Sequence, residues 1–179
     1  MKKDDTNKKH AYSEEAQKNA RKSHWYSDIA SSVTKCPFCD LKEKYIIAES
    51  GDVVLTMNLF PYIDGHLMVI PKKHIERLED FSPQDWRDAH KMISLGMEVI
   101  RQGCDVKDVN VLYREGTKKS GSSLKHLHIH LLPITPEFMV YENFRFSYNF
   151  CDIEVAPVEM AKRLRSVAAE IPFAKKACR

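Results

Sequence analysis

The chain has 179 residues, 43% of them hydrophobic and 30% charged, which is enough for one folded domain with a core and with terminal extensions. Its formal net charge is +3. Residues 1–23 carry seven Lys or Arg against four Asp or Glu, so the rest of the chain, with 21 residues of each sign, is formally neutral. A neutral body argues against a dedicated nucleic-acid-binding protein.

The sequence shows neither an export signal nor a membrane span. The first ten residues, MKKDDTNKKH, contain no apolar segment of the kind found in signal peptides, and the longest apolar runs, LMVI and LHIHLL, are far too short to cross a bilayer. The five cysteines are an odd number, and two of them form a C-x-x-C pair. These features predict a soluble protein of the reducing cytoplasm, without a membrane partner.

The predicted elements begin with a basic extension, residues 1–35. Its first residues, to about position 12, are polar enough to be disordered, and Ser13 could cap a short helix after them. We expect this extension to be solvated and mobile, and the folded body to begin at residue 36. Two strands are predicted next, at 52–59 and 66–71.

A long helix is the clearest element of the sequence. Ser82 is expected as its N-cap, Pro83 lies in its first turn and Gly103 is expected to end it. Apolar residues recur at helical spacing and predict the buried face: Trp86, Ala89, Ile93, Met97 and Ile100.

Two further strands and a second helix complete the prediction. The strands are expected at 108–115 and 125–133, separated by a polar turn. Residues 136–179 form a C-terminal extension in which a helix is expected at 157–171. Strand, strand, helix, strand, strand, helix is typical of an α+β domain with an antiparallel sheet.

The segment KHLHIHLLP, residues 125–133, places His126, His128 and His130 at every second position. Successive side chains of a strand point to opposite faces, so the three imidazoles would share one face, while the Leu and Ile residues between them enter the core. Three of the eight histidines of the chain lie here. The face could carry catalysis, or it could hold a metal directly. Alternate side chains of a strand lie about 6–7 Å apart, which disfavours direct coordination of one ion.

The sequence CPFC at residues 36–39 supports three interpretations. The thiols of Cys36 and Cys39 could be a buried pair, a redox dithiol or two ligands of a tetrahedral metal site. The redox interpretation is weak, because no strongly hydrophobic strand precedes the loop. A zinc site would need two more ligands, and His74 and His126 are available.

The residues Gly121, Ser122 and Ser123 immediately precede the histidine segment. Small residues let backbone N–H groups approach a phosphate, and serine hydroxyls can donate to its oxygens. Such a loop is more often only a turn. Beside three imidazoles, it is a candidate anion pocket.

Together these motifs resemble the histidine-triad (HIT) family, whose signature alternates three His with apolar residues. The match is complete over residues 126–132, and the upstream stretch NLFPYIDGHLMVIPKKH also fits. The resemblance covers residues 36–135, which would be the HIT domain, and it implies an α+β fold and a homodimer. In some family members a C-x-x-C pair completes a structural zinc site. Carried over, its ligands would be Cys36, Cys39, His74 and His126.

The resemblance also implies a mechanism at the α-phosphorus of a nucleotide. His128 would be the nucleophile and form a nucleotidyl-histidine, with a backbone carbonyl fixing its tautomer. His130 would donate to the phosphoryl or leaving oxygens, helped by Ser123 and the loop amides. Asn58 would contact the ribose, and His66 would support the triad from behind. Without zinc, His126 would instead serve as a proton relay.

This chain departs from the family pattern at two positions. Ser122 stands where the family often has Gln, and Arg114 replaces the usual Asn after the preceding strand. We expect Arg114 to contact phosphate together with Gly121, Ser122 and Ser123.

The predicted function is therefore hydrolysis or nucleotidyl transfer on a dinucleoside polyphosphate or a nucleoside phosphoramidate. Asn58 and the histidine segment favour the dinucleoside polyphosphate, and His130, where transferases usually have Gln, disfavours the transferase branch. A phosphorylase with the same intermediate is the alternative. A nucleotide-binding adaptor without turnover is the alternative of another class.

Overall fold

The computed structural model describes the following residues: 13–23, 26, 28–29, 34–116, 124–142 and 145–172. The disorder expected in residues 1–12 lies outside the described part, as does the Gly121–Ser123 loop.

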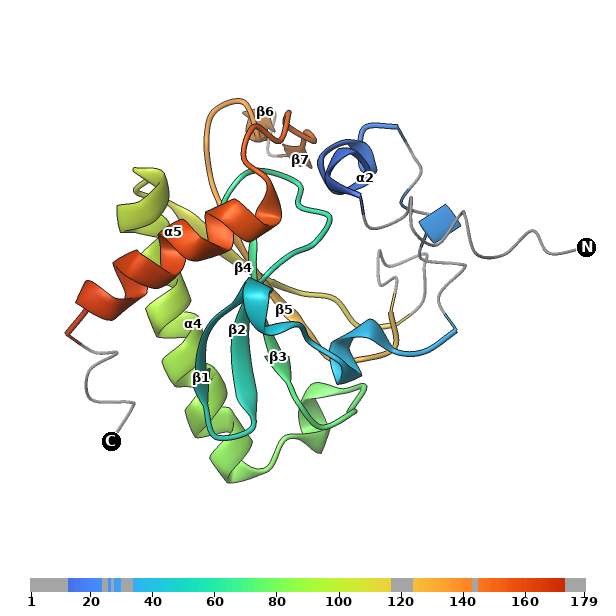
Figure 1. Cartoon of the computed structure of the whole chain (residues 1–179), viewed down its shortest axis with the longest axis vertical. Helices are drawn as coiled ribbons and strands as arrows, with labels where there is room; N and C mark the ends of the chain where they lie inside the picture. Colours follow the sequence, from blue (N-terminus) through green and yellow to red (C-terminus); the bar gives the residue numbers. More distant parts are fainter. Residues whose placement is uncertain are drawn as a thin grey trace, which may run out of the picture.

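The body is built on one five-stranded sheet in which every neighbouring pair is antiparallel, as predicted (Figure 1). Its spatial order is β1-β2-β3-β5-β4. The strand bounds are β1 Ile46–Ser50, β2 Val53–Met57, β3 Leu67–Pro71, β4 Val109–Tyr113 and β5 Ile129–Pro133. Strand β1 was not predicted, since its sequence IIAES does not alternate.

The histidine strand is shorter than predicted, because β5 begins at Ile129. His126, which lies at a bend, and His128 precede it in a segment that belongs to no ladder. The N–H of Leu127 donates to Ile75 O (2.7 Å). The carbonyl of His126 accepts a hydrogen bond from the imidazole of His128 rather than from the backbone of a neighbouring strand. The alternation still holds: Leu127, Ile129 and Leu131 are buried in the main core.

Two helices cover the face of the sheet that carries this core (Figure 1). Helix α4 spans Pro83–Cys104, and α5 spans Pro157–Glu170. Ser82 caps α4 as predicted, with its Oγ accepting from the Asp85 N–H at 3.1 Å.

The buried face of α4 differs from the predicted one. Trp86 is 44% exposed, so it was wrongly placed in the core. Of the predicted residues Ala89 and Ile100 are buried, whereas Ile93 and Met97 are half-buried. The fully packed positions form a stripe rotated away from Trp86: Ala89, Met92, Leu95, Gly96, Val99, Ile100 and Gly103.

Gly103 does not end α4 but lies inside its last turn. The helix ends after Cys104, and Asp105 takes the left-handed conformation with φ of 54°. A Cβ on Gly103 would lie 2.3 Å from Leu164 Cδ2. This glycine therefore permits the close approach of α5 to α4.

The described residues of the N-terminal extension around α2 are docked on the body, where a mobile segment was expected. Helix α2, Glu14–Asn19, is capped by the Ser13 hydroxyl as predicted. Its Gln17 is buried and donates to Tyr45 OH (3.0 Å), and Ala20 after it is fully buried.

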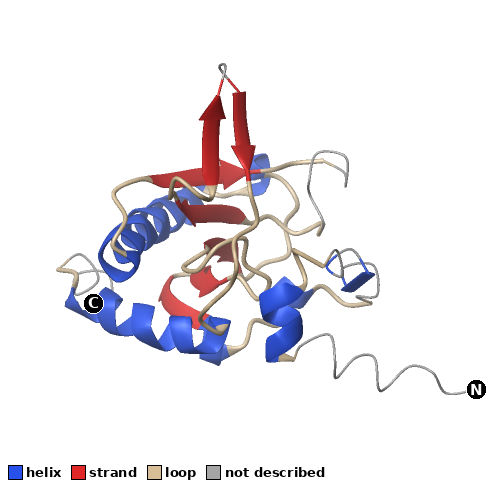
Figure 2. Ribbon diagram, turned by 90° about the horizontal axis from the view of Figure 1, so that it is seen from above, coloured by secondary structure: helices blue, strands red, loops and turns tan. Residues whose placement is uncertain are grey.

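Short elements complete the described chain. Three 3-10 turns are present: η1 Pro37–Cys39, η2 Glu43–Tyr45 and η3 Leu78–Asp80. Strands β6 Met139–Glu142 and β7 Arg145–Tyr148 pair in a separate ladder that stands away from the body (Figure 2).

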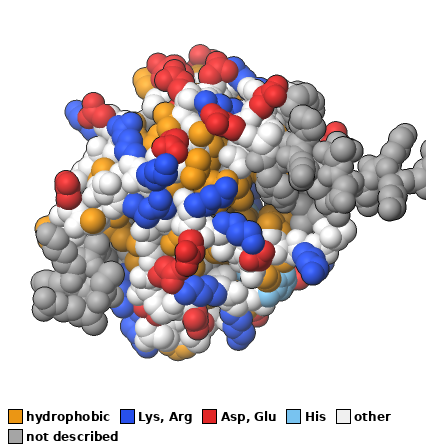
Figure 3. All heavy atoms as spheres, in the orientation of Figure 1, with side chains coloured by type: hydrophobic (Ala, Val, Ile, Leu, Met, Phe, Trp, Pro, Cys, Tyr) orange, Lys and Arg blue, Asp and Glu red, His pale blue; other side chains and the backbone are white. Residues whose placement is uncertain are grey.

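The sequence argued against a dedicated nucleic-acid-binding protein and against a membrane span, and the surface and the helices of the structure can be compared with these two expectations. On the face seen in Figure 3, acidic and basic side chains are interspersed and do not segregate by sign. No helix in the described part of the chain combines the length and apolarity that a bilayer crossing requires.

Asp88 on α4 gives a stability prediction. Hydrogen bonds from Gln84 and Ser50, together with Lys91, lower the pKa of this buried carboxyl to about 2. A lowered pKa stabilises the fold above the unfolded value of about 3.9, and this contribution is lost as pH falls toward 2. Asp88→Asn should therefore lower the free energy of unfolding at pH 7 by about 1–2 kcal/mol. This figure is smaller than the full pKa shift implies, because solvent near Gln84 and Lys91 screens the carboxylate.

Urea unfolding at pH 7 and at pH 3 would measure this effect, and the difference from wild type should shrink at the lower pH. Glu98→Gln on the same helix is the control, because the Glu98 carboxylate pairs with Arg101 and accepts from Gln102 near the surface, and it should change stability by less than about 0.5 kcal/mol. An Asp88→Asn effect of the same size at both pH values would contradict the assignment.

Candidate functional site

The candidate site lies on the sheet face opposite α4. Successive side chains of β3 point to opposite faces of the sheet, so Leu67 and Val69 pack in the main core, whereas Met68 and Ile70 lie on the face of the candidate site. Met68 is the register partner of His130 on β5, so the triad continues this second face. The three histidines are buried there, each less than 10% exposed.

His128 is held in a single tautomer. Its Nδ1 lies 2.7 Å from the carbonyl oxygen of His126, which can only accept, so Nδ1 carries the proton. The lone pair of the neutral ring is therefore on Nε2. Since His128 lines the pocket described below, this tautomer suits a nucleophile.

His130 receives the opposite tautomer through His66. The Tyr62 N–H donates to His66 Nδ1 (3.2 Å), so His66 carries its proton on Nε2 and donates it to His130 Nδ1 at 2.9 Å. The proton of His130 is then on Nε2. His128 can thus offer a lone pair, and its neighbour His130 can offer an N–H.

Burial keeps these imidazoles neutral. It lowers the pKa of His128, and it lowers the pKa of His130 to about 2 with further contributions from His128 and from the guanidinium groups of Arg114 and Arg21. His66, with no exposed surface, also has its pKa lowered, first by burial and then by His130. A neutral His128 needs no deprotonation before it attacks an electrophile.

His66 and Asn58 are more deeply buried than expected of residues that contact a ligand directly. His66 is fully buried, which fits the predicted support from behind the triad but leaves no surface for a nucleotide. Asn58 Oδ1 accepts from the Phe60 N–H (2.9 Å), and Asn58 Nδ2 lies 3.3 Å from both ring nitrogens of His66. Asn58 nevertheless lines the pocket, so its ribose contact stays a prediction.

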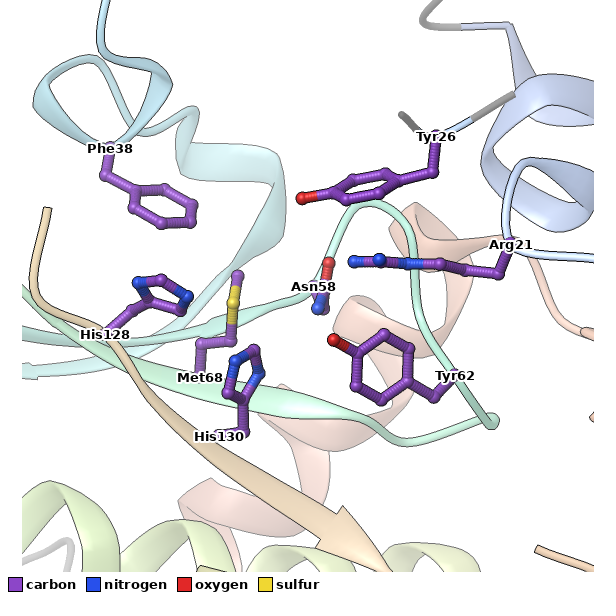
Figure 4. A pocket seen from close by; sticks show the side chains of 8 residues that line it. All are labelled: Arg21, Tyr26, Phe38, Asn58, Tyr62, Met68, His128 and His130. Carbon is purple, nitrogen blue, oxygen red and sulfur yellow. The ribbon is translucent and has the colours of Figure 1, made fainter. Parts of the chain in front are cut away.

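The pocket in front of His128 and His130 is small and mostly aromatic (Figure 4). Phe38 of η1 lies against His128, with ring centroids 5.0 Å apart. Sequence reasoning missed five of the eight lining residues: Arg21, Tyr26, Phe38, Tyr62 and Met68. Phe38 and Tyr62 lie in the quoted motifs CPFC and FPYIDG, but Arg21 and Tyr26 carry no recognisable signal.

Arg114 reaches this region from the end of β4. Its Nη1 donates to the Tyr62 hydroxyl at 3.1 Å, and its charge contributes to the low pKa values of His128 and His130. Gly121, Ser122 and Ser123, the predicted anion loop, lie outside the described residues.

The predicted metal ligands come together in a second cluster. The ligand atoms of Cys36, Cys39, His74 and His126 all lie within 4.8 Å of one another. The closest sulfur–nitrogen pairs are 3.2 Å apart, close to the roughly 3.5 Å edge of a tetrahedron with zinc–sulfur and zinc–nitrogen bonds of ordinary length. In the described part of the chain, His128 and His130 join no such group, so direct coordination by the triad lacks support.

His126 connects this cluster to the triad. Its Nε2–H donates to the Pro71 carbonyl (2.8 Å), which leaves Nδ1 free to bind a metal, 3.2 Å from Cys36 Sγ. Burial lowers the pKa of His126, which favours the neutral ligand form. Two thiols and two imidazoles at these distances fit a tetrahedral metal site.

Comparison with curated proteins gives relatives over part of the chain. AP-4-A phosphorylase of Mycobacterium tuberculosis (strain CDC 1551 / Oshkosh) is 31% identical over 104 residues, which cover 58% of this chain. Bis(5'-nucleosyl)-tetraphosphatase [asymmetrical] of Schizosaccharomyces pombe is 29% identical over 43% of this chain and 42% of the relative. The chain spans about half the length of the phosphorylase, 53%.

Comparison with solved structures supports the fold. A hypothetical histidine triad nucleotide-binding protein from Sulfolobus tokodaii superposes with a TM-score of 0.60 at 23% identity, over 75% of this chain and 92% of that one. A zinc-bound histidine triad family protein from Mycobacterium smegmatis gives 0.58 at 22% identity, over 79% and 96%. The HIT domain model matches residues 41–137, more than half of the chain. With the triad and its supporting contacts in place, this match shows that the chain belongs to the HIT-domain family.

Proposed function

We propose that the protein cleaves dinucleoside polyphosphates at the α-phosphorus through a nucleotidyl-His128 intermediate. The observation that carries the proposal is the opposed pair of tautomers, with the lone pair of His128 and the N–H of His130 both on Nε2 beside one pocket. The names of the AP-4-A phosphorylase and tetraphosphatase relatives support the substrate class.

In the first step, His128 Nε2 attacks the α-phosphorus and the bond to the bridging oxygen breaks. With diadenosine tetraphosphate the electron pair leaves on ATP, and the adenylyl group remains covalently bound to His128 Nε2. His130 donates its Nε2–H toward the phosphoryl and leaving oxygens, where negative charge develops. Arg114, and the Gly121–Ser123 loop, are proposed to bind phosphate oxygens.

In the second step, a water oxygen attacks the same phosphorus, the phosphorus–nitrogen bond breaks with its electron pair returning to His128 Nε2, and the water proton is released to solvent. The products are adenosine monophosphate and the neutral His128. The His126 carbonyl accepts the Nδ1–H throughout, which stabilises the positive charge that the ring carries while it is bonded to phosphorus.

We also propose that Cys36, Cys39, His74 and His126 hold a structural zinc ion. Their donor set is one that zinc prefers, and a related structure from Mycobacterium smegmatis is zinc-bound. Such an ion would fix the two segments that carry Phe38 and the His126 carbonyl. The domain limits, 36–135 with extensions on each side, and a homodimer remain predictions.

Product analysis tests the function and separates hydrolysis from phosphorolysis. Incubated with diadenosine tetraphosphate in ¹⁸O-water, the protein should release ATP and adenosine monophosphate carrying one ¹⁸O, by chromatography and mass spectrometry. The phosphorylase alternative has support in the AP-4-A phosphorylase relative. Adding inorganic phosphate would then yield ADP in place of the labelled monophosphate, because phosphate attacks the same intermediate.

A failure of both reactions would contradict the proposed function. If the protein binds the tetraphosphate but releases no product, the adaptor interpretation replaces it.

A further inference from the structure

The N-terminal extension contributes side chains to the pocket, although it lies before the residues that the HIT domain model matches. After α2 the chain runs along the pocket, where Arg21 and Tyr26 form part of the lining. Lys18 Nζ donates to the Glu154 carbonyl (2.9 Å), and Lys22 pairs with Asp152. These contacts attach the extension to the body on both sides of Arg21.

Arg21 is held in a fixed orientation. Its Nε donates to the Phe60 carbonyl (3.0 Å), and its guanidinium lies between two tyrosine rings, 3.3 Å from the centroid of Tyr26 and 4.5 Å from that of Tyr62. Figure 4 shows the guanidinium between these rings with its end directed into the pocket. Stacking on both faces leaves the edge of the guanidinium as its binding surface.

The charge of Arg21 is not neutralised by a carboxylate of the described residues. Asp152 nearby is paired with Lys22. Arg114 adds a second guanidinium near the pocket. It donates to the hydroxyl of Tyr62, whereas Arg21 stacks on the ring of that tyrosine. Neither guanidinium forms an ion pair with a carboxylate in the described part of the chain, and two such cations beside one pocket can bind a phosphate chain.

The position of Arg21 relative to His128 indicates which phosphates it would bind. A series of ring contacts connects His128 with Arg21. The ring centroids of His128 and His130 are 4.8 Å apart, those of His130 and Tyr62 are 5.9 Å apart, and the guanidinium of Arg21 stacks on Tyr62. Displacement at phosphorus is in line, so the leaving group departs on the side away from His128. Figure 4 shows Arg21 across the pocket from His128, on the side where the leaving group would lie.

We infer that Arg21 binds the leaving phosphate chain and selects substrates in which a polyphosphate departs from the α-phosphorus. This rests on the proposed function. Tyr26 and Tyr62 orient the guanidinium, and the docked extension carries it. The extension is therefore a specificity element of the active site, and its role is to recognise the part of the substrate beyond the adenylyl group.

Two substrates with the same adenylyl group test this inference, because they differ only in what leaves. Diadenosine tetraphosphate loses a polyphosphate, and adenosine 5'-phosphoramidate loses ammonia. Arg21→Gln should lower kcat/KM for the tetraphosphate by about tenfold to a hundredfold, the effect of removing a charge-assisted hydrogen bond. Its effect on the phosphoramidate should be about ten times smaller.

Two variants make the comparison specific. Arg21→Lys keeps the charge and should recover part of the tetraphosphate activity, which also distinguishes recognition from a folding defect. Lys162→Gln removes a surface charge on α5, which covers the other face of the sheet, and should leave both activities as in wild type. Equal losses on the two substrates, no loss on the tetraphosphate, or the same selective loss in Lys162→Gln would each overturn the inference.

Binding measurements keep the inference separate from the proposed function. If the wild-type protein cleaves neither substrate, the proposed function fails, and calorimetric titration with ATP and with adenosine monophosphate then decides the role of Arg21. Selective weakening of ATP binding in Arg21→Gln supports the inference. Equal weakening of both ligands, or of neither, overturns it.

Discussion

His128→Ala is expected to abolish both turnover of diadenosine tetraphosphate and formation of a covalent adenylyl adduct. No other nucleophile at this pocket presents an unprotonated nitrogen among the described residues, because the tautomer network places the proton of His130 on Nε2. Loss of a catalytic nucleophile typically lowers kcat on the order of 10⁴- to 10⁶-fold. Intact-protein mass spectrometry after brief mixing with substrate would detect the adduct, and chromatography would measure the turnover.

His90→Ala is the matched control, since His90 is an exposed histidine on α4 across the sheet from the site. It should keep both the adduct and the rate. An adduct that persists in His128→Ala would assign the nucleophile elsewhere. A wild-type protein that turns over substrate without a detectable adduct in rapid quenching would argue for direct attack by water.

Cys36→Ser is expected to remove bound zinc and to destabilise the fold. The wild-type protein should contain about one equivalent of zinc by elemental analysis, and the variant almost none, because serine is a poor replacement for a thiolate ligand. Loss of a structural ion should lower the free energy of unfolding by roughly 3–5 kcal/mol. For a chain of this size that corresponds to a fall of about 10 °C in Tm.

Cys151→Ser is the control, because Cys151 lies outside the metal cluster and its thiol makes only a long contact with a backbone carbonyl. It should change neither the zinc content nor the Tm appreciably. Chelation of the wild-type protein should reproduce the Cys36→Ser melting curve. A wild-type protein purified with no zinc, and unable to take it up with a rise in Tm, would refute the metal site.

The parts of the fold that follow a regular period could be predicted from the sequence. The alternation around His130 placed Leu127, Ile129 and Leu131 in the core, and the capping residue Ser82 marked the start of α4. The buried stripe of α4 was less accurate, because Trp86 matches the helical period but lies beyond the edge of the sheet-covering face. The four residues of the metal cluster could be named because of the family resemblance, since the spacing of CPFC alone left three interpretations open.

The residues that complete the pocket could not be predicted, because their positions depend on contacts between distant parts of the chain. Arg21 reaches the site through a hydrogen bond to the Phe60 carbonyl, and the Tyr26 ring packs edge-on against the Phe60 ring, with the centroids 5.5 Å apart. A basic residue in a polar tail has the same local pattern whether it is docked or solvated. The burial of His66 likewise depends on tertiary packing. The stretch NLFPYIDGHLMVIPKKH indicated that this histidine belongs to the site but not how deeply it lies.

The docking of α2 has a consequence for the order in which the protein acquires its native form. A six-residue helix is marginal on its own, and the partners of Lys18 and Lys22 are Glu154 and Asp152, with Lys18 and Glu154 separated by 136 residues. During synthesis α2 emerges from the ribosome well before these partners and must therefore wait for them. Contacts of such high sequence separation form late, so the triad should assemble before the polyphosphate side of its pocket.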